Sequence, residues 1–235
     1  MLLEEGLGKI GLTSIEKMAP LLFRYIKEIE LFNEAYGLVK VSGRRELVIK
    51  HILDSLAPLP SVLAPVISLV TRKPCRIADV GSGAGLPGIP LAVCLAAESL
   101  IPAENKFQAE VTLIERMGRR AGFLQNTIAS LGLAKVSIVQ EEMEKLPLKP
   151  ENGFDLIVFR AFKPLEKAFL KDLLKLLNDG GTLAAYKGRR QVIEEELSGL
   201  EELRNTNRLN ISWEIYPLEV PFLEEERHLV LLRKA

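Results

Sequence analysis

The chain has 235 residues, 48% of them hydrophobic and 26% charged, an ordinary globular composition that excludes intrinsic disorder and fits one sizeable domain. Its 31 basic and 31 acidic residues give a net charge of zero. Taken alone this argues against nucleic-acid binding, although charge distribution matters more than the sum. The longest apolar stretch, 86–97, is shorter than the ~20 residues of a bilayer-spanning helix. Because no secretory segment precedes it, we expect a cytoplasmic protein without a membrane partner.

Helical periodicity dominates the first part of the chain, up to residue 74. Apolar residues between 21 and 32 recur at the spacing of a helix face, and Ser14 is a candidate N-cap for that helix. A second helix is expected over 44–56, before four prolines between 58 and 74 that break or kink the chain. We therefore expect residues 1–74 to form an N-terminal helical extension.

From residue 75 onward, short apolar runs alternate with helical patterns. The predicted strands are 76–80, 111–114, 136–140, 154–159, 182–187, 213–218 and 228–233, and the predicted helices 89–97, 119–131, 165–177 and 191–203. Such alternation is typical of a parallel sheet covered on both faces. The last two strands are joined without a helix, so the final strand should be antiparallel. The sequence predicts an α/β fold, with 75–235 as one compact unit around a mostly parallel, Rossmann-like, seven-stranded sheet.

A glycine-rich turn follows the first predicted strand, in the run IADVGSGAGLPG at 77–88. The strand ends in Asp79, and the turn contains Gly81, Gly83 and Gly85. Glycines at this place let the backbone approach a nucleotide-like ligand, and ligands of open α/β sheets lie at the carboxyl ends of the strands. We predict that these four residues bind a cofactor, with a ligand-free structural turn as the alternative.

Two cofactors fit this turn. Gly83, Gly85 and Gly88 also satisfy the dinucleotide fingerprint. S-adenosylmethionine is favoured because the glycines begin directly after an acidic strand end, where Asp79 suits the cationic amino group of the methionine portion. The predicted C-terminal hairpin also favours it, since class I methyltransferases have this hairpin and plain dinucleotide-binding sheets usually lack it.

Two further strand ends would border the same ligand. Glu115 ends the second strand and can accept hydrogen bonds from both ribose hydroxyls, a device that NAD and S-adenosylmethionine proteins share. The alternative is a surface glutamate that pairs with Arg116 or Arg119. After the third strand, Met143 is placed to pack on an adenine ring, although a short polar loop would look similar.

The sequence offers no certain catalytic residue and no metal-ligand spacing. The fourth strand ends in FRAFKP at 159–164, without the Asn- or Asp-Pro-Pro-aromatic motif of many exocyclic-amine methyltransferases. Cys75 and Cys94 lie away from this cleft and read as buried thiols. Methylation of a ring nitrogen such as guanine N7 requires alignment and no general base. We therefore expect no catalytic base.

Several separated stretches together resemble one known family. They are FNEAY at 32–36, KHILDS at 50–55, the run 79–90, Arg119-Arg120 with Phe123-Leu124, RAF at 160–162, Lys187-Gly188, and ERHLV at 226–230. Over nearly its whole length the chain resembles the bacterial small-subunit ribosomal RNA methyltransferase G family, formerly called glucose-inhibited division protein B. The resemblance implies a class I methyltransferase fold, S-adenosylmethionine as cofactor, and methyl transfer to guanine N7 in 16S ribosomal RNA.

The family pattern also implies roles for individual residues. The residues it places at the cofactor are Gly81, Leu86, Met143, Glu144 and Arg160. From its strand-end position, Arg160 would meet a cofactor carboxylate or an RNA phosphate. Four more matching residues carry no role that the sequence explains: His51, Asp54, Arg227 and His228. A lone helical histidine such as His51 is more often a hydrogen-bonded core residue than a catalyst.

Basic residues gather in short clusters that we expect to hold RNA. They are Lys40, Arg44, Arg45, Arg119, Arg120, Lys163, Lys187, Arg189 and Arg190. Such phosphate contacts make RNA affinity fall steeply with salt, whereas a merely solvated face would not. The expected partner is 16S ribosomal RNA or the small ribosomal subunit, bound by a monomer.

Three alternatives remain. The first is a methyltransferase of the same fold that acts on another RNA site or on a small molecule. The second is an NAD-dependent oxidoreductase, which the glycine fingerprint also fits. The third is a cofactor-free RNA-binding protein. Calorimetry with NADH and with S-adenosylmethionine separates the enzyme classes. The chain departs from the family pattern at 37–39 and at Phe159, and its segment 98–110 is longer than usual.

Overall fold

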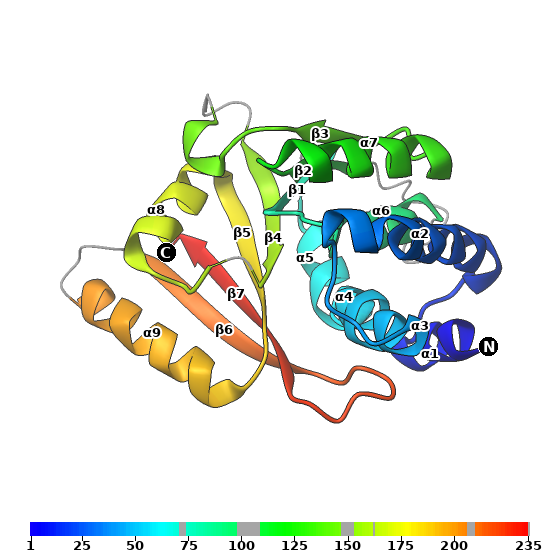
Figure 1. Cartoon of the computed structure of the whole chain (residues 1–235). Helices are drawn as coiled ribbons and strands as arrows, with labels where there is room; N and C mark the ends of the chain where they lie inside the picture. The colour runs from blue at the N-terminus through cyan, green and yellow to red at the C-terminus, as the bar shows by residue number, and fades with distance from the viewer. Residues whose placement is uncertain (71–73, 98–108, 147–152, 162, 206–209, 235) are drawn as a thin grey trace.

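The computed structural model describes residues 1–70, 74–97, 109–146, 153–161, 163–205 and 210–234. Most of the long segment at 98–110, and Phe162 of the RAF motif, lie outside the described residues. The chain folds around one sheet, with helices on both of its faces (Figure 1).

The sheet has seven strands in the order β3-β2-β1-β4-β5-β7-β6. They are β1 (Cys75–Val80), β2 (Ala109–Ile114), β3 (Val136–Val139), β4 (Phe154–Arg160), β5 (Leu177–Lys187), β6 (Ile211–Leu218) and β7 (Arg227–Lys234). The pairs among β1 to β5 are parallel, and β7 is antiparallel to both β5 and β6. The seven predicted strands and the antiparallel last strand are confirmed. Strand order reverses between β1 and β4, so ligands are expected at the carboxyl ends of these two strands.

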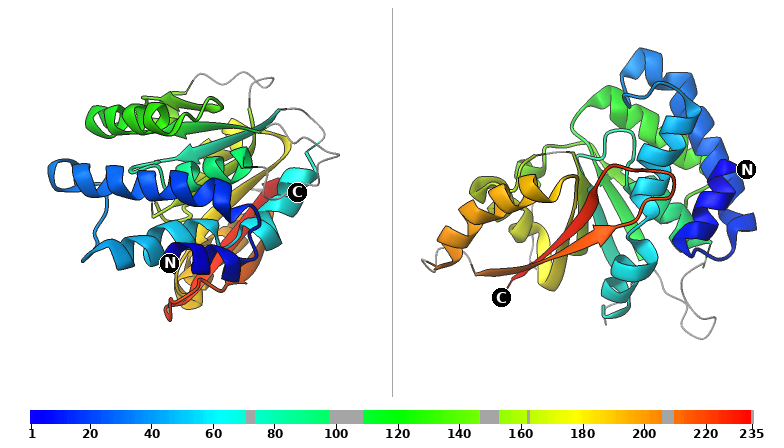
Figure 2. Two further views of the ribbon diagram at one scale, coloured as in Figure 1. Left: turned by 90° about the vertical axis from the view of Figure 1, so that its right-hand side faces the viewer. Right: turned by 90° about the horizontal axis from the view of Figure 1, so that it is seen from below.

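Alternate strand residues pack against helices on opposite faces, as the period of two in a strand requires. On one face, Ile77 packs with α6 (Gly88–Ala96) and α7 (Gly118–Leu131). On the other, Ala78 packs with α8 (Lys167–Leu176) and α9 (Arg190–Asn205). Figure 2 shows α9 in orange on the side of the sheet opposite the blue N-terminal helices. The four predicted helices are confirmed with small shifts of their ends.

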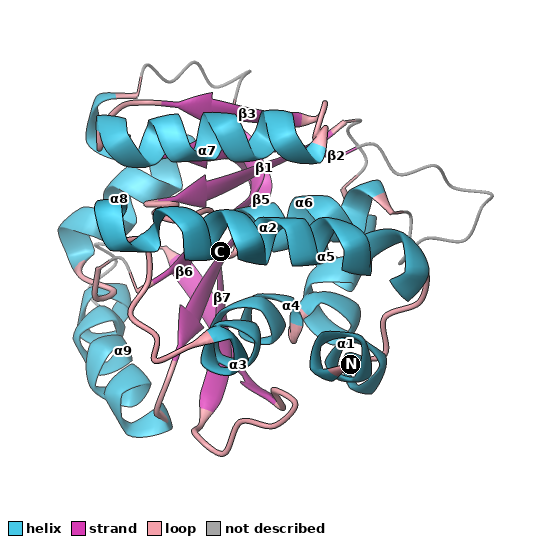
Figure 3. Cartoon of the chain, turned by 45° about the vertical axis from the view of Figure 1, so that its right-hand side comes forward, coloured by secondary structure: helices cyan, strands magenta, loops and turns pink. Residues whose placement is uncertain are grey.

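The extension forms an outer layer on the α6 and α7 side (Figure 3). Its elements are α1 (Leu2–Ile10), α2 (Ile15–Tyr36), α3 (Arg44–Leu47), the π-helical η1 (Val48–Leu53), α4 (Asp54–Leu56), the π-helical η2 (Leu59–Leu63) and α5 (Ala64–Ser68). Helix α2 contacts α6 and α7, and Ser14 precedes it as the N-cap residue, without a side-chain cap bond. Leu22 and Ile52 belong to the same buried cluster as Ile77. The extension thus shares its core with the sheet.

The prolines from residue 58 onward, predicted to break or kink the chain, coincide with a turn at 57–58 and the π-helical η2, after which α5 continues to Ser68. Helical turns extend over Arg44–Ser68, a stretch long and apolar enough to cross a membrane by composition, but 67% of its apolar 18-residue window is buried inside the protein. Pro60 and Pro65 stand in the first two positions of η2 and α5, where an amide hydrogen has no helical partner to lose. Packing in the core accounts for the apolar composition of this stretch.

Candidate functional site

The glycine-rich turn is tied to the end of the neighbouring strand. The amides of Gly81 and Ser82 donate to the Ile114 carbonyl of β2, at 3.0 and 3.1 Å. Gly83 has a φ of +60°, and a Cβ built on it would find only the Gly81 carbonyl, 3.8 Å away. The backbone at Gly83 is therefore open to a ligand, in a conformation that L-residues other than glycine rarely adopt.

Asp79 lies beneath this turn and is fully buried. Its Oδ2 accepts hydrogen bonds from the Ser82 hydroxyl, at 2.7 Å, and from the Gly88 amide, at 3.0 Å. Its Oδ1 is buried without a partner among the described residues. Burial raises the pKa of Asp79 to about 6, against the lowering effect of the Ser82 and Gly88 hydrogen bonds. A cation near Oδ1, reached directly or through water, would stabilise the ionised form.

Glu115 joins the turn to the end of β2. Its two carboxylate oxygens accept the amides of Gly83, at 2.9 Å, and Met117, at 2.8 Å. The side chain is buried at the wall of a pocket. Because a carboxylate oxygen has two lone pairs, both oxygens keep an acceptor site for ligand hydroxyls.

A pocket of about 620 Å³ opens at this place, within the range of small-molecule sites. We call it the glycine-turn pocket. Of the predicted cofactor residues, Gly81, Glu115, Met143 and Glu144 line it. Met143 begins the short 3-10 helix η3 (Met143–Lys145) and is buried. Asp79 and Gly83 are not among its lining residues, but they flank Gly81, which is. Together with the open Gly83 backbone and the unpartnered Asp79 oxygen, the lining groups suit a ligand with an amino group, a ribose and an apolar ring. The residues present therefore fit S-adenosylmethionine.

Gly85 and Leu86 lie on the protein side of the turn. A Cβ on Gly85 would come within 2.5 Å of Ile89 Cγ1 and 3.0 Å of Leu124 Cδ2, and Leu86 is 6% exposed. Neither lines the glycine-turn pocket. Their contact with the cofactor stays a prediction, and their visible role is to pack the turn against α6 and α7.

The replacement Gly85→Ala is expected to lower the free energy of unfolding by about 1–3 kcal/mol, because the new methyl group overpacks the turn and strains a φ of +94°. Urea unfolding of the variant beside Gly122→Ala measures this. Gly122 lies in α7 with no atom within 4 Å of its built Cβ, so its alanine variant should be at least as stable as the wild type. Equal stability of the two variants would contradict the packing role.

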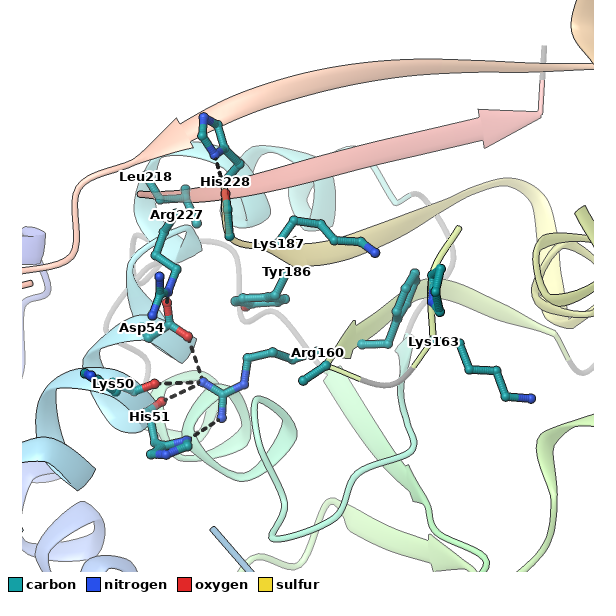
Figure 4. A pocket seen from close by; sticks show the side chains of 14 residues that line it. Lys50, His51, Asp54, Arg160, Lys163, Tyr186, Lys187, Leu218, Arg227 and His228 are labelled. Atoms are coloured by element: carbon teal, nitrogen blue, oxygen red, sulfur yellow. Dashed lines mark hydrogen bonds and ion pairs between the residues drawn. The ribbon is translucent and has the colours of Figure 1, made fainter. Parts of the chain in front are cut away.

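Arg160 is not among the residues that line the glycine-turn pocket, and its predicted contact with a cofactor carboxylate or an RNA phosphate stays a prediction. Its side chain extends from the end of β4 into a second pocket of about 490 Å³, which we call the arginine pocket (Figure 4). There Arg160 Nη1 pairs with Asp54 Oδ2 at 2.8 Å. Arg227 Nε, from the start of β7, pairs with Asp54 Oδ1 at 3.1 Å. One buried carboxylate, 4% exposed, thus holds two arginines.

The π-helical turn η1 completes the contacts of Arg160. Its Nη1 also lies 3.3 and 3.4 Å from the carbonyl oxygens of Lys50 and His51. Its Nη2 lies 3.1 Å from His51 Nδ1. Since a guanidinium can only donate, His51 Nδ1 is the acceptor. Burial, then the charge of Arg160, lowers the pKa of His51 to about 4, so this histidine is neutral near pH 7.

The same pKa shift makes folding depend on pH. The folded-state pKa of His51 lies below its unfolded value of 6.5, so the unfolded chain binds the extra proton first. The contribution of neutral His51 to the free energy of unfolding is fully present above pH 6.5 and is lost as pH falls toward 4. The loss over this window is of the order of 2–3 kcal/mol. Urea midpoints at pH 7.5 and 4.5 should fall further for the wild type than for His51→Gln, and parallel losses would contradict this.

Cationic side chains predominate among the residues that line the arginine pocket, and each of them is paired with a carboxylate, Lys50 with both Glu46 and Glu225. Its cationic lining residues are Lys50, Arg160, Lys163, Lys187 and Arg227, and Asp54 is the carboxylate among its lining residues. Lys187 Nζ is held by Glu196 Oε2 at 2.6 Å. His228 is buried, and its Nδ1 lies 2.7 Å from the Gly188 carbonyl, to which it donates. These cationic groups on the pocket wall suit an anionic ligand that takes the place of part of their carboxylate contacts.

The two pockets adjoin each other. Ala161 and Lys163, which follow β4, line both. Lys163 Nζ pairs with Glu144 Oε1 at 2.8 Å and so connects the wall of one pocket to the wall of the other. Ala161 has a φ of +49°, an uncommon left-handed conformation for a residue with a Cβ. A ligand in each pocket would meet its neighbour beside this residue.

The predicted RNA-binding residues divide into two groups. Those with a carboxylate partner are Arg44 with Glu30, Lys163 with Glu144, Lys187 with Glu196 and Arg190 with Glu194. Lys40, Arg45, Arg119 and Arg189 are exposed and form no ion pair with another described residue. Arg120 lines the glycine-turn pocket and donates to the Gly37 carbonyl at 3.3 Å. Most of these residues follow carboxyl ends of parallel strands or lie in the α2–α3 link.

Some residues of the site escaped the sequence analysis. Asp54, His51 and Arg227 match the family pattern, but the sequence assigned them no role. Tyr25 was predicted only as part of an apolar helix face, and no role was predicted for Tyr186. The Tyr25 hydroxyl donates to the Ala84 carbonyl at 2.7 Å, and that of Tyr186 to the Ser55 carbonyl at 2.8 Å. The clustering of polar residues in an apolar helix, at 50–55, was the available signal for Asp54 and His51.

Cys75 and Cys94 are buried, as predicted, and form no disulfide with a described residue. Burial raises the pKa of the Cys75 thiol to about 12, so it stays protonated. Among the described residues no group of three His, Cys, Asp or Glu side chains could hold a metal ion.

Comparisons with known proteins point in one direction. The family model described as rRNA small subunit methyltransferase G matches residues 18–230. A ribosomal RNA small subunit methyltransferase G from Treponema denticola is 36% identical, over 99% of this chain and 94% of the relative. Its namesake from Treponema pallidum (strain Nichols) is 39% identical, over 98% of this chain and 92% of the relative.

Solved structures share the fold at low identity. A putative O-methyltransferase from Klebsiella pneumoniae superposes with a TM-score of 0.55 at 15% identity, over 92% of this chain and 90% of the other. The tRNA (m1A58) methyltransferase from Aquifex aeolicus gives 0.54 at 17% identity, over 78% and 68%. The predicted class I methyltransferase fold is confirmed.

Proposed function

The chain belongs to the rRNA small subunit methyltransferase G family, and on that premise we propose that it transfers a methyl group from S-adenosylmethionine to N7 of a guanine in 16S ribosomal RNA. The observation that carries this proposal is the pair of adjoining pockets, one suited to the cofactor and one lined by arginine and lysine side chains. When bound, S-adenosylmethionine supplies an electrophilic methyl group on a sulfonium centre.

The glycine-turn pocket holds the cofactor through groups on three strand ends. Asp79 and Gly81 receive the amino group, directly or through water. Glu115 accepts the ribose hydroxyls, and Met143 packs beside the adenine. These contacts rest on the unpartnered Asp79 oxygen, the acceptor sites left on Glu115, and the buried place of Met143 at the pocket wall.

The arginine pocket receives the target nucleotide, whose phosphates meet Arg160, Arg227 and Lys187. Two of the groups there that resemble general bases are already engaged: Asp54 by two arginines and His51 by Arg160. An acceptor that must lose a proton before attack would find no free base in either. Guanine N7 has an available lone pair, so its methylation needs alignment and exclusion of water alone.

The wider RNA surface consists of the exposed basic residues around the carboxyl edge of the sheet. Lys40, Arg45, Arg119 and Arg189 are exposed without ion-pair partners among the described residues. Arg44, Arg120 and Arg190 lie beside them in the same segments. We propose that a monomer binds the small ribosomal subunit with this surface in the cytoplasm, and that affinity falls steeply with salt.

Methyl transfer tests the function directly. Labelled S-adenosylmethionine is incubated with the protein and with small subunits from a strain that lacks the gene, and the labelled nucleoside is identified by mass. We expect 7-methylguanosine in 16S RNA. Label in another nucleoside, or in a small molecule and none in RNA, would replace the proposed acceptor by another substrate of the same fold.

A further inference from the structure

Tyr25 connects the helical extension to the cofactor-binding turn. It lies on α2, is 0% exposed, and donates from its hydroxyl to the Ala84 carbonyl at 2.7 Å. Ala84 stands between Gly83 and Gly85, within the turn. A Cβ on Gly85 would lie 3.3 Å from the Tyr25 hydroxyl, so the hydroxyl packs directly against the backbone of the turn.

The turn needs this donor because its own backbone does not supply one. The amide four residues after Ala84 belongs to Gly88, and it donates to Asp79 Oδ2 instead. The amides of Gly85 and Leu86 donate to the Ser82 carbonyl. The buried Ala84 carbonyl is therefore satisfied by a side chain from another element, and an unsatisfied buried carbonyl is costly.

The Tyr25 hydroxyl is a constant donor. Burial raises the pKa of Tyr25 well above its usual value, so the proton stays on the oxygen throughout the neutral range. Tyr25 does not line the glycine-turn pocket, so any influence on a ligand there passes through the Ala84 carbonyl and the turn.

We propose that Tyr25 is a positioning residue for S-adenosylmethionine: by holding Ala84, it keeps the backbone of Gly81 and Gly83 in the orientation that binds the cofactor. The inference rests on the proposed function for the identity of this ligand. The extension would then have two roles: α2 positions the cofactor-binding turn, and η1 and α4 form a wall of the arginine pocket.

The test compares Tyr25→Phe with Ile29→Val. Phenylalanine keeps the ring and removes only the donor. Ile29 is a fully buried residue one turn further along α2, so its valine variant weakens the same helix by a similar amount without touching the turn. Calorimetry with S-adenosylmethionine should show a dissociation constant about 10-fold higher for Tyr25→Phe, and one unchanged within 2-fold for Ile29→Val.

Two further readouts separate positioning from loss of fold. At saturating cofactor, Tyr25→Phe should recover the wild-type kcat and show a raised KM for S-adenosylmethionine. Amide hydrogen exchange in the turn should be faster in Tyr25→Phe than in Ile29→Val. Unchanged cofactor affinity in Tyr25→Phe, or equal changes in both variants, would overturn the inference. Failure of the proposed function would differ, because the wild type itself would then bind no cofactor or methylate no 16S RNA.

Discussion

Replacement of Gly83 by valine is expected to raise the dissociation constant of S-adenosylmethionine at least ~100-fold while the protein stays folded. Gly83 has a φ of +60°, which costs a β-branched residue about 1–3 kcal/mol. The Cβ itself would meet only the Gly81 carbonyl at 3.8 Å. The fold can therefore accept the side chain, which would instead occupy space beside the glycine-turn pocket. Calorimetry with the purified variant measures the loss.

Gly132→Val is the matched control for this prediction. Gly132 caps the end of α7 with a φ of +65° and no atom within 4 Å of its built Cβ. Both variants should lose similar free energy of unfolding, because the backbone strain is the same. Only Gly83→Val should lose cofactor binding. Cofactor affinity within a few-fold of the wild type in Gly83→Val would show that the ligand binds elsewhere.

Asp54→Asn is expected to reduce kcat/KM for methyl transfer to the small subunit by about 100-fold or more, equivalent to about 2.7 kcal/mol. Asparagine keeps the shape of the side chain and removes the charge that holds Arg160 and Arg227 together. The two guanidinium groups would then repel each other across the arginine pocket. Unfolding free energy should fall as well, by about 2–3 kcal/mol, because partly buried charges lose their partner.

Three comparisons assign that effect to the arginine pocket. Asp172→Asn removes a carboxylate from an exposed pair with Lys175 on α8, and it should leave both stability and transfer nearly unchanged. Affinity for S-adenosylmethionine should survive in Asp54→Asn, since Asp54 does not line the glycine-turn pocket. A variant that is less stable yet keeps its wild-type kcat and KM for the subunit would restrict Asp54 to a structural role.

The sheet and the glycine turn could be predicted because their signals are local. Strands buried on both faces appear in the sequence as continuous apolar runs. The turn is indicated by the glycine spacing after an acidic strand end, all within the run 77–88. The start of β5 was placed too late, at residue 182 rather than 177, because Asn178, Asp179 and two glycines read as a loop. In the structure Leu177 pairs with Phe154 at the beginning of β4, and residues 178–181 form the register shift before Thr182 pairs with Leu156.

The arginine pocket could not be predicted in the same way. Arg160 and Asp54 are 106 positions apart in the sequence, and no local sequence pattern around either residue indicates that the two form a pair. Position at a strand end suggested that Arg160 reaches the cofactor. The sequence did not indicate that Arg160 would also pair with Asp54, a buried carboxylate on the extension that would be costly to leave unpaired.

The boundary at residue 74 marks a change in sequence pattern and does not divide the buried core. The buried cluster that contains Leu22 and Ile52 of the extension also contains Ile77 and Leu113 of the sheet. We propose that 1–74 and 75–235 unfold together, in one transition. A truncated chain that begins at residue 75 would expose one face of α6 and should not fold alone, and a stable, cooperatively unfolding fragment would contradict this.

The pairing of Asp54 with Arg227 has a consequence for synthesis of the chain. These residues are 173 positions apart, and β7, made last, lies between β5 and β6. During translation neither the sheet nor the arginine pocket can be completed until β7 has been made. The arginine pocket is therefore among the last parts of the fold to form on a growing chain.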